Sequence, residues 1–163
     1  MGVLMKQLSI VVLLLLSACT VSFNPPNAQQ LPEPTAGTET EQREAVKAAR
    51  GYLEMIDRGE YKAIWRDAGP LLRDMTNETA FITTLKVMKK TFALLPGRKP
   101  KGLGFNTQVD PGGPVGEYVV VIFEAKVGNL TATEKVVMQK EQGKWKIVGY
   151  FITKRRQTGA NSG

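Results

Sequence analysis

The chain has 163 residues and a formal net charge of +7, with one cysteine and no histidine. The length suits a single domain, and the proportions of apolar residues (42%) and charged residues (23%) exclude disorder throughout. Without histidine and with one cysteine, the chain lacks the residues for a Cys/His zinc site, a Ser-His-Asp or Cys-His nucleophile arrangement, or an internal disulfide. We therefore expect no catalytic centre of these kinds, no metal and no cofactor.

Residues 1–18 have the pattern of a secretory signal peptide. Lys6 is followed by the apolar run Leu8–Leu16, which is shorter than the roughly 20 residues that a membrane-spanning helix needs. The run ends in Leu16-Ser17-Ala18-Cys19, which resembles the lipobox of bacterial lipoproteins. A start at Met5 instead of Met1 would give the same signal in a more compact form.

The lipobox resemblance implies cleavage before Cys19 and attachment of a diacylglycerol to its thiol. Acyl chains such as palmitate would then anchor the mature chain to a membrane, because two or three chains bind stably. Thr20 follows the cysteine. By the sorting pattern of Gram-negative lipoproteins, that residue favours the periplasmic side of the outer membrane.

Residues 19–40 are predicted to form the lipidated cysteine and a disordered tether. Four of the nine prolines lie here, among Asn, Gln, Thr and Glu, a composition that favours extended chain and cannot form a core. The basic tail, residues 154–163, is also expected to be flexible. A single α+β domain is predicted between them, over residues 41–153.

Helices are predicted in the first half of this domain. Thr38 to Glu41 have the capping-box pattern, and Gly59 is placed to end the helix that follows. A second helix is expected over residues 61–68, and a third after Asn77. Apolar residues at helical spacing mark the buried faces of the first and third helices: Ala45, Ala49, Leu53 and Ile56, then Phe81, Leu85, Met88, Phe92 and Leu95.

Four strands are predicted in the second half, over residues 103–109, 117–127, 131–140 and 144–153. Helices followed by a four-stranded meander indicate an α+β fold, with the helices packed on one face of a curved antiparallel sheet. Alternation along the last strand predicts two opposite faces: Trp145, Ile147 and Phe151 on one, and Val148, Tyr150 and Ile152 on the other.

The second face of this sheet is also predicted to be apolar, so something must cover it. The strands over residues 117–127 and 144–153 carry apolar residues on both faces, whereas the helices can cover only one. Three interpretations stay open: the curved sheet closes a pocket, the second face pairs with another subunit, or loops and long side chains cover it.

Several segments resemble the domain of unknown function 4019 family of small exported bacterial proteins. They are Gly59-Glu60-Tyr61 with Trp65, Arg98-Lys99, Gly116-Glu117-Tyr118-Val119-Val120 with Phe123, and Gly143–Ile152. The resemblance spans about residues 45–152, although Gly97 stands where the family has a serine. It implies a fold similar to the cone-shaped α+β folds of nuclear transport factor two and the cystatin-like group. Those folds host enzymes, ligand binders and interaction domains, so the resemblance implies no activity.

Tyr118 and Tyr150 are the candidate pocket residues, because an aromatic body with a polar tip suits a ligand site. Enzymes of the cone folds typically place a carboxylate beside tyrosine hydroxyls. Asp57, Asp67 and Asp74 supply carboxylates, but their charged neighbours in the sequence favour solvated side chains. We therefore predict that the protein is not an enzyme.

A basic segment is the other candidate site. No acidic residue occurs between Thr79 and Val109, while six basic residues do: Lys86, Lys89, Lys90, Arg98, Lys99 and Lys101. These basic side chains have two possible roles. They contact anionic lipid headgroups or an anionic envelope polymer, or they simply form a solvated helix face. Nucleic acid is not expected as a partner of an exported chain without a binding motif.

These observations favour a lipid-anchored cell-envelope protein with a non-catalytic binding or scaffolding role, in contact with the membrane and with an envelope protein or polymer. Two alternatives remain at this stage. One is a small-molecule-binding or enzymatic member of the same cone fold, and the other is a structural homo-oligomer.

Overall fold

The computed structural model describes residues 31–92 and 96–156. The predicted signal peptide, Cys19, Leu95 and most of the basic tail lie outside the described residues.

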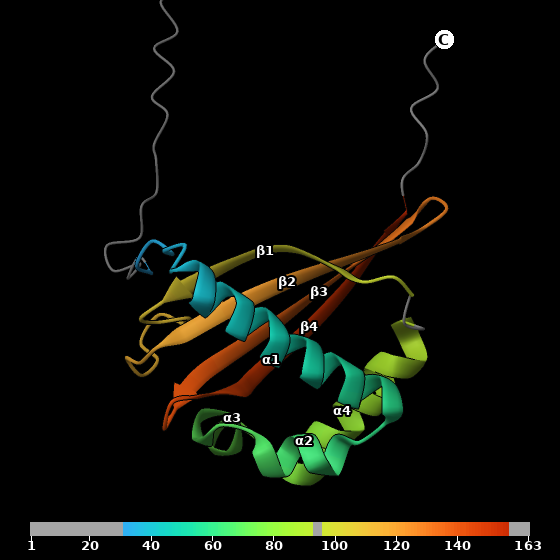
Figure 1. Cartoon of the computed structure of the whole chain (residues 1–163). Helices are drawn as coiled ribbons and strands as arrows, with labels where there is room; N and C mark the ends of the chain where they lie inside the picture. The colour runs from blue at the N-terminus through green and yellow to red at the C-terminus, as the bar shows by residue number, and fades with distance from the viewer. Residues whose placement is uncertain (1–30, 93–95, 157–163) are drawn as a thin grey trace, which may run out of the picture.

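Within these ranges, four helices precede four strands in the chain, and the helices lie together on one side of the sheet (Figure 1). The helices are α1 (Glu39–Arg58), α2 (Tyr61–Asp67), α3 (Pro70–Met75) and α4 (Glu78–Phe92), and the strands are β1 (Lys99–Asn106), β2 (Tyr118–Val127), β3 (Leu130–Glu141) and β4 (Lys144–Arg156). The strands form one antiparallel sheet in the order β1-β2-β3-β4, so the predicted α+β fold is confirmed. None of the described helices is long and apolar enough to cross a membrane.

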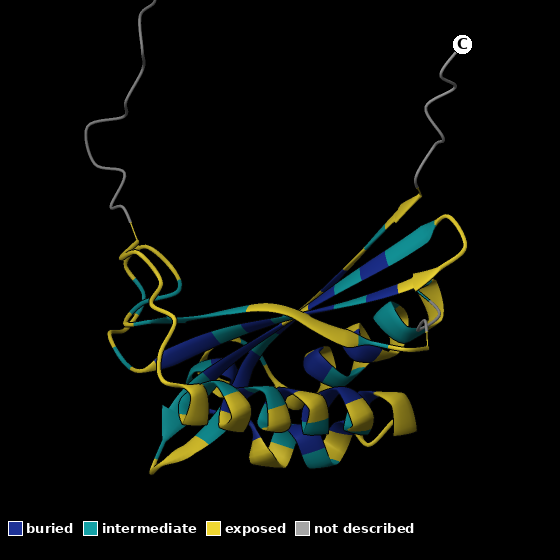
Figure 2. Cartoon of the chain, turned by 45° about the horizontal axis from the view of Figure 1, so that its top comes forward, coloured by how far each residue is buried: buried dark blue, intermediate teal, exposed yellow. Residues whose placement is uncertain are grey.

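The ends of α1 are those that the sequence predicts. The Thr38 hydroxyl accepts a hydrogen bond from the Glu41 amide at 3.3 Å, and the Glu41 carboxylate accepts one from the Thr38 amide at 2.7 Å. Gly59 ends the helix in the left-handed conformation, with φ 74°. The predicted apolar face is buried against the sheet, while the exposed residues of α1 lie on its outer side (Figure 2).

The later helices differ from the prediction at one place. The sequence does not predict α3, because Gly69-Pro70 is typical of a break; the proline instead occupies the first turn of a new helix, where its missing N–H costs no hydrogen bond. α4 begins after Asn77 as expected, with the Asn77 side chain accepting a hydrogen bond from the Ala80 amide at 2.9 Å. Phe81 and Leu85 are buried beneath α4.

The sheet departs from the predicted alternation in β4. Val137 pairs with Gly149 and Met138 pairs with Ile147, so Val148 is an extra residue without a partner on β3. Such a bulge shifts the side-chain alternation of a strand by one position. The predicted grouping of Phe151 with Trp145 and Ile147 is therefore wrong: Tyr150 and Ile152 join Ile147 in the core, and Phe151 is 52% exposed on the opposite face.

The helices cover one face of the sheet, which we call the inner face. The main core lies between them, and the end of the sheet that carries the β2–β3 turn projects past the helices (Figure 2). A smaller cluster on the outer face consists of Tyr118, Val137 and Val148, with Leu71 of α3 packed against it. The two apolar faces that the sequence predicts are thus both partly covered.

Residues 31–37 belong to the predicted tether but lie along the edge strand β1. The Thr35 amide donates to the Phe105 carbonyl at 2.8 Å, and the Phe105 amide donates to the Thr35 carbonyl at 2.9 Å. The Asn106 side chain donates to the Pro32 carbonyl at 2.7 Å. Edge strands present unpaired backbone groups, and this segment satisfies two of them. The last described part of the expected tether is therefore part of the folded domain.

Replacing Gly37 with Ala should release this segment from β1. Gly37 has φ 65°, and an added Cβ would lie 2.5 Å from the Phe105 ring. The left-handed conformation costs a residue with a side chain about 1–2 kcal/mol, and the clash adds to it. We expect faster hydrogen exchange of the Thr35 and Phe105 amides, measured by NMR.

Gly51→Ala is the matched control, because Gly51 lies within α1 and its added Cβ would meet no atom within 4 Å. This change should stabilise the helix by about 0.5–1 kcal/mol and leave exchange at β1 unaltered. Unchanged exchange of Thr35 in the Gly37 variant would contradict the assignment of residues 31–37 to the folded domain.

Candidate functional site

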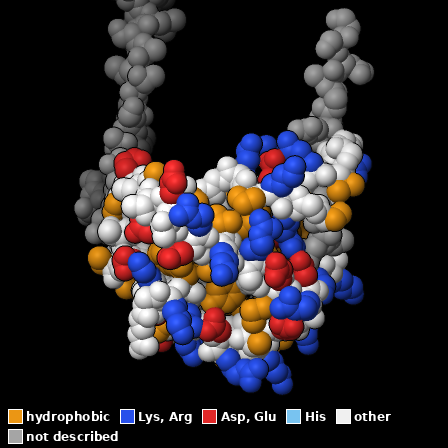
Figure 3. Space-filling model, in the orientation of Figure 1, with side chains coloured by type: hydrophobic (Ala, Val, Ile, Leu, Met, Phe, Trp, Pro, Cys, Tyr) orange, Lys and Arg blue, Asp and Glu red, His pale blue; other side chains and the backbone are white. Residues whose placement is uncertain are grey.

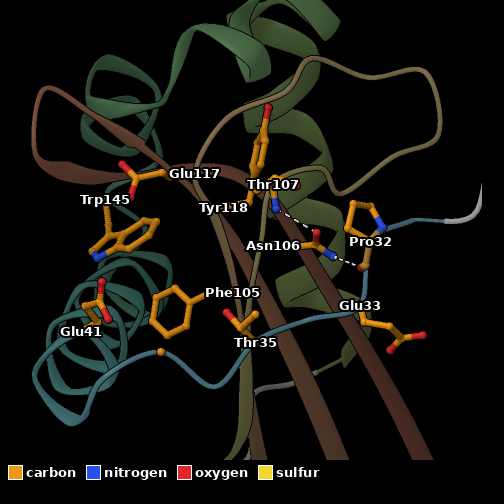
Figure 4. A pocket seen from close by; sticks show the side chains of 11 residues that line it. Pro32, Glu33, Thr35, Glu41, Phe105, Asn106, Thr107, Glu117, Tyr118 and Trp145 are labelled. Atoms are coloured by element: carbon orange, nitrogen blue, oxygen red, sulfur yellow. Dashed lines mark hydrogen bonds between the residues drawn. The ribbon is translucent and has the colours of Figure 1, made fainter.

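A pocket of about 310 Å³ lies where residues 32–37 pass the start of α1 and the adjacent ends of β1, β2 and β4 (Figure 4). We call it the α1 pocket. It is lined by Pro32, Glu33, Thr35, Gly37, Glu41, Phe105, Asn106, Thr107, Glu117, Tyr118 and Trp145. One of its walls is the segment that pairs with β1, so the pocket exists only while that segment is in place.

Two aromatic rings form the apolar side of the α1 pocket. Phe105 and Trp145 lie with their ring centroids 5.8 Å apart and their planes inclined by 47°. They come from β1 and β4, the two edges of a four-stranded sheet. Their contact shows that the sheet is curved enough at this end for large side chains from its two edge strands to meet across its inner face.

Two carboxylates flank the indole ring in the view of Figure 4. Glu41 and Glu117 lie on either side of Trp145, whereas the Glu33 side chain points away from the rings. The hydrogen bonds from the Thr38 amide and hydroxyl hold the pKa of Glu41 below its usual value. This carboxylate therefore stays negatively charged at and below neutral pH.

A cation of the chain itself already occupies part of this arrangement. The Lys140 ammonium lies 5.4 Å from the centroid of the Trp145 ring and 3.6 Å from a carboxylate oxygen of Glu117. An ammonium is attracted both to an aromatic face and to a carboxylate. The Trp145 ring and the Glu117 carboxylate therefore both lie beside one ammonium group of the chain, although Lys140 is not itself a lining residue of the pocket.

Tyr118, a predicted pocket residue, contributes its ring but not its hydroxyl. The hydroxyl donates to the Pro114 carbonyl at 3.0 Å and points away from Phe105 and Trp145 (Figure 4). Burial raises the pKa of this hydroxyl. Tyr118 is therefore a neutral wall of the pocket.

Tyr150, the other predicted pocket residue, lies elsewhere. It is on the inner face of the sheet, whereas the Tyr118 side chain is in the outer cluster, so the structure does not bring the two together. The Tyr150 hydroxyl is buried without a hydrogen-bond partner among the described residues. Burial and the nearby Glu134 carboxylate raise its pKa, so this hydroxyl remains protonated.

A buried ion-pair network lies beside Tyr150. Glu134 on β3 is 2% exposed, and its carboxylate is 2.7 Å from Nε of Arg98. The other end of the same guanidinium donates to Asp57, at the end of α1, with one bond of 2.8 Å. Burial raises the pKa of Glu134, and the charge of Arg98 acts against that rise. Arg98 thus joins the core of the sheet to the C-terminal end of α1.

Asp67, another of the predicted carboxylates, also has structural partners. The Tyr52 hydroxyl donates to Asp67 at 2.6 Å, and Lys146 forms an ion pair with the same carboxylate. The hydrogen bonds from Lys146 and Tyr52 lower the pKa of Asp67 although burial acts in the opposite direction. In the part of the chain that the structure describes, no group of three or more acidic, cysteine or histidine side chains is placed to hold a metal ion.

The basic segment that the sequence predicts is not one continuous surface. The Arg98 side chain is only 13% exposed, and the Lys89 ammonium donates to the Asp57 carbonyl at 2.6 Å. Lys86, Lys90, Lys99 and Lys101 are exposed. On the face that carries α1, basic and acidic side chains are interspersed with apolar ones (Figure 3). Arg98 therefore contributes little to the exposed surface of this segment.

Sequence reasoning missed the three carboxylates Glu41, Glu117 and Glu134 of these two sites. The sequence identifies Glu41 only as a helix cap, and Glu117 only as part of the family resemblance. Glu134 stands between Ala132 and Val136 in an alternating strand, at a position where its side chain must face the core. A charged residue at an inward position of a strand is the signal that could have identified it.

Replacing Arg98 with Met should destabilise the fold by about 3–5 kcal/mol, because a buried carboxylate loses its cation. Without that cation, the pKa of Glu134 in the folded state lies further above its value in the unfolded chain. As pH rises, the unfolded chain therefore releases the Glu134 proton at a lower pH than the folded chain does. The free energy of unfolding of the variant is highest below the pKa that Glu134 has in the unfolded chain, and it falls as pH rises through the pKa that Glu134 has in the folded state. Urea unfolding over a pH series measures this loss.

The double variant Arg98→Met with Glu134→Met should recover much of the stability, because it leaves no buried charge without a partner. Arg43→Met is the control: its ion pair with Glu39, at 3.6 Å, is between side chains that are 69% and 92% exposed, so its loss should cost at most about 1 kcal/mol. Equal destabilisation of the single and double variants would show that Glu134 does not depend on Arg98.

The comparisons with known proteins identify a family and nothing finer. No curated protein and no solved structure compared with the chain matches it, so the likeness to the cone-shaped folds stays a prediction. The sequence model described as a protein of unknown function (DUF4019) matches residues 48–150. That range takes in α2, α3, α4, the whole of β1, β2 and β3 and about half of β4. The chain belongs to the DUF4019 family.

Proposed function

We propose that this protein is a lipid-anchored, non-catalytic binding module of the bacterial cell envelope, and that its α1 pocket binds a ligand through a primary amine. The anchoring part of the proposal rests on the sequence Leu16-Ser17-Ala18-Cys19 after a short apolar run. Residues 20–31 separate Cys19 from the pocket wall at Pro32. A dozen extended residues reach about 40 Å, so the pocket stays close to the membrane surface.

The single observation that supports the choice of ligand is the pairing of aromatic rings with ionised carboxylates in one small pocket. Trp145 and Phe105 supply ring faces, and Glu41 and Glu117 supply negative charge beside them. The whole chain is basic, with net charge +7, so a local acidic pocket is selective against the anions that the rest of the surface attracts. An amine on an apolar carbon chain satisfies both kinds of group.

The binding proposal is tested by titrating the full chain, in a neutral detergent, with cadaverine and with pentanediol. The two molecules have the same carbon chain, but only cadaverine carries amines. We expect cadaverine to shift the NMR signal of the Trp145 indole N–H and to leave that of Trp65, which packs against Phe81, unchanged. Equal shifts with pentanediol would exclude an amine site.

Two substitutions in the same ion pair should change the affinity in opposite directions. Glu117→Gln removes an attracting charge and should weaken cadaverine binding about 2–5-fold, whereas Lys140→Gln removes a competing ammonium and should strengthen it by a similar factor. A purely structural ion pair would give the same sign for both variants. Two changes of the same sign would therefore contradict the proposed binding mode.

The anchoring proposal is tested separately by metabolic labelling with palmitate in a bacterial host. Cys19→Ser should abolish incorporation of the label and release the protein from the membrane fraction, because the thiol that would carry the diacylglycerol is lost. Ser22→Ala leaves the lipobox intact and should label normally. Normal labelling of the Cys19 variant would end the anchoring proposal and leave the amine site untouched.

A further inference from the structure

An apolar groove of about 360 Å³ runs along the outer face of the sheet, on the side away from α1. Its floor includes Val120, Val137 and Val148, and α3 borders it through Leu71 and Met75. We call it the outer groove. It is a different site from the α1 pocket, although Tyr118 lines both.

Large apolar side chains stand exposed on the rim of the outer groove. Phe151 is 52% exposed and Met75 is 70% exposed, and both line it. Val115, which follows the lining residue Pro114, is 79% exposed. Exposed apolar side chains gathered around an apolar groove are characteristic of a protein–protein contact.

Two opposite charges lie at the two ends of the outer groove. Lys135 stands at one end, with its ammonium 4.8 Å from the centroid of the Phe151 ring. Asp110 stands at the other end, in the loop that follows β1. Lys135 pairs with Ile122, whereas Asp110 lies in the loop beyond Asn106, which pairs with Tyr118 at the start of β2, so the two charged residues lie toward opposite ends of the groove. Neither charge has an ion-pair partner in residues 31–92 and 96–156.

We infer that the outer groove binds a second copy of this chain in a two-fold symmetric dimer. A two-fold axis through the middle of the groove places each end of one copy opposite the other end of its partner. Lys135 of each copy then faces Asp110 of the other, and the contact is made twice. The same operation places each exposed Phe151 ring toward the Pro114 end of the opposite groove.

This charge arrangement is what selects a second copy as the occupant. A groove with one cation and one anion at its opposite ends is complementary to itself when rotated by half a turn. Charges of one sign at both ends would repel a copy of the same surface. The dimer explains together the exposed Phe151, the groove beside it and the two charges at its ends.

The test measures the mass of the full chain in a density-matched neutral detergent by sedimentation equilibrium. The wild-type chain should sediment as a dimer. Lys135→Glu and Asp110→Lys should each weaken the dimer at least about tenfold, because each replaces two attractions with two repulsions. A monomeric wild-type chain, or single variants that dimerise as the wild type does, would overturn the inference.

Mixing the two single variants provides the decisive outcome. In the mixed pair, the carboxylate introduced by Lys135→Glu on one chain faces the ammonium introduced by Asp110→Lys on the other. At the second contact, the unchanged Lys135 of one chain faces the unchanged Asp110 of the other. The mixture should therefore form dimers although each variant alone does not. If the mixture stays monomeric, the two residues do not meet across a two-fold axis and the inference is overturned.

Two further variants separate the contact from folding and from net charge. Phe151→Asp should be monomeric while its circular dichroism spectrum and melting temperature stay close to those of the wild type, because the side chain is on the surface. Lys62→Glu makes the same charge change on α2, away from the outer face, and should remain a dimer. Dissociation of the Lys62 variant would assign the effect to net charge and overturn the inference.

Discussion

The extra residue in β4, Val148, is the constraint on which both the α1 pocket and the outer groove depend. Because Val148 has no partner on β3, the alternation of β4 changes at this point, and the Tyr150 and Ile152 side chains enter the core while Phe151 turns outward. Bulges also increase the local bend and twist of a strand. The strong curvature at this end of the sheet brings Trp145 of β4 against Phe105 of β1.

The packing around the bulge explains why it is stable. The Gly69 amide, between α2 and α3, donates to the Ile147 carbonyl at 3.0 Å and so satisfies a backbone group next to the bulge. An added Cβ on Gly69 would lie 2.9 Å from a methyl group of Val148. Only glycine permits this approach, which places α3 along the edge of β4 and makes it one border of the outer groove.

Local signals in the sequence are enough to predict most of the fold. The capping box at Thr38, the stop at Gly59, the cap at Asn77 and the turns between strands each depend on neighbouring residues, and the structure confirms them. The bulge could not be predicted, because Ile147 to Ile152 are compatible with either register until β3 is paired beside them. The error at Phe151 follows from that one residue.

The candidate sites are harder to predict because their residues meet only through the tertiary structure. Tyr118 and Tyr150 have the right chemistry for a pocket but lie on opposite faces of the sheet. The α1 pocket combines residues from the N-terminal segment with β1, β2 and β4, and no spacing in the sequence indicates that these segments converge. Composition favours a free segment at residues 31–37. The structure differs because two backbone hydrogen bonds join this segment to a distant strand, and such bonds leave no local pattern in the sequence.

The position of Tyr118 links the two proposed activities. Its ring lines both the α1 pocket and the outer groove, and its hydroxyl holds the Pro114 carbonyl in the loop between β1 and β2. That loop carries Asp110 toward the outer groove and Glu117 toward the pocket. In the proposed dimer, a second copy that fixes Asp110 would also fix the loop that carries Glu117, the carboxylate of the proposed amine site. Because coupling between two binding equilibria is reciprocal, any increase in amine affinity on dimerisation equals the increase in dimer affinity that the amine produces.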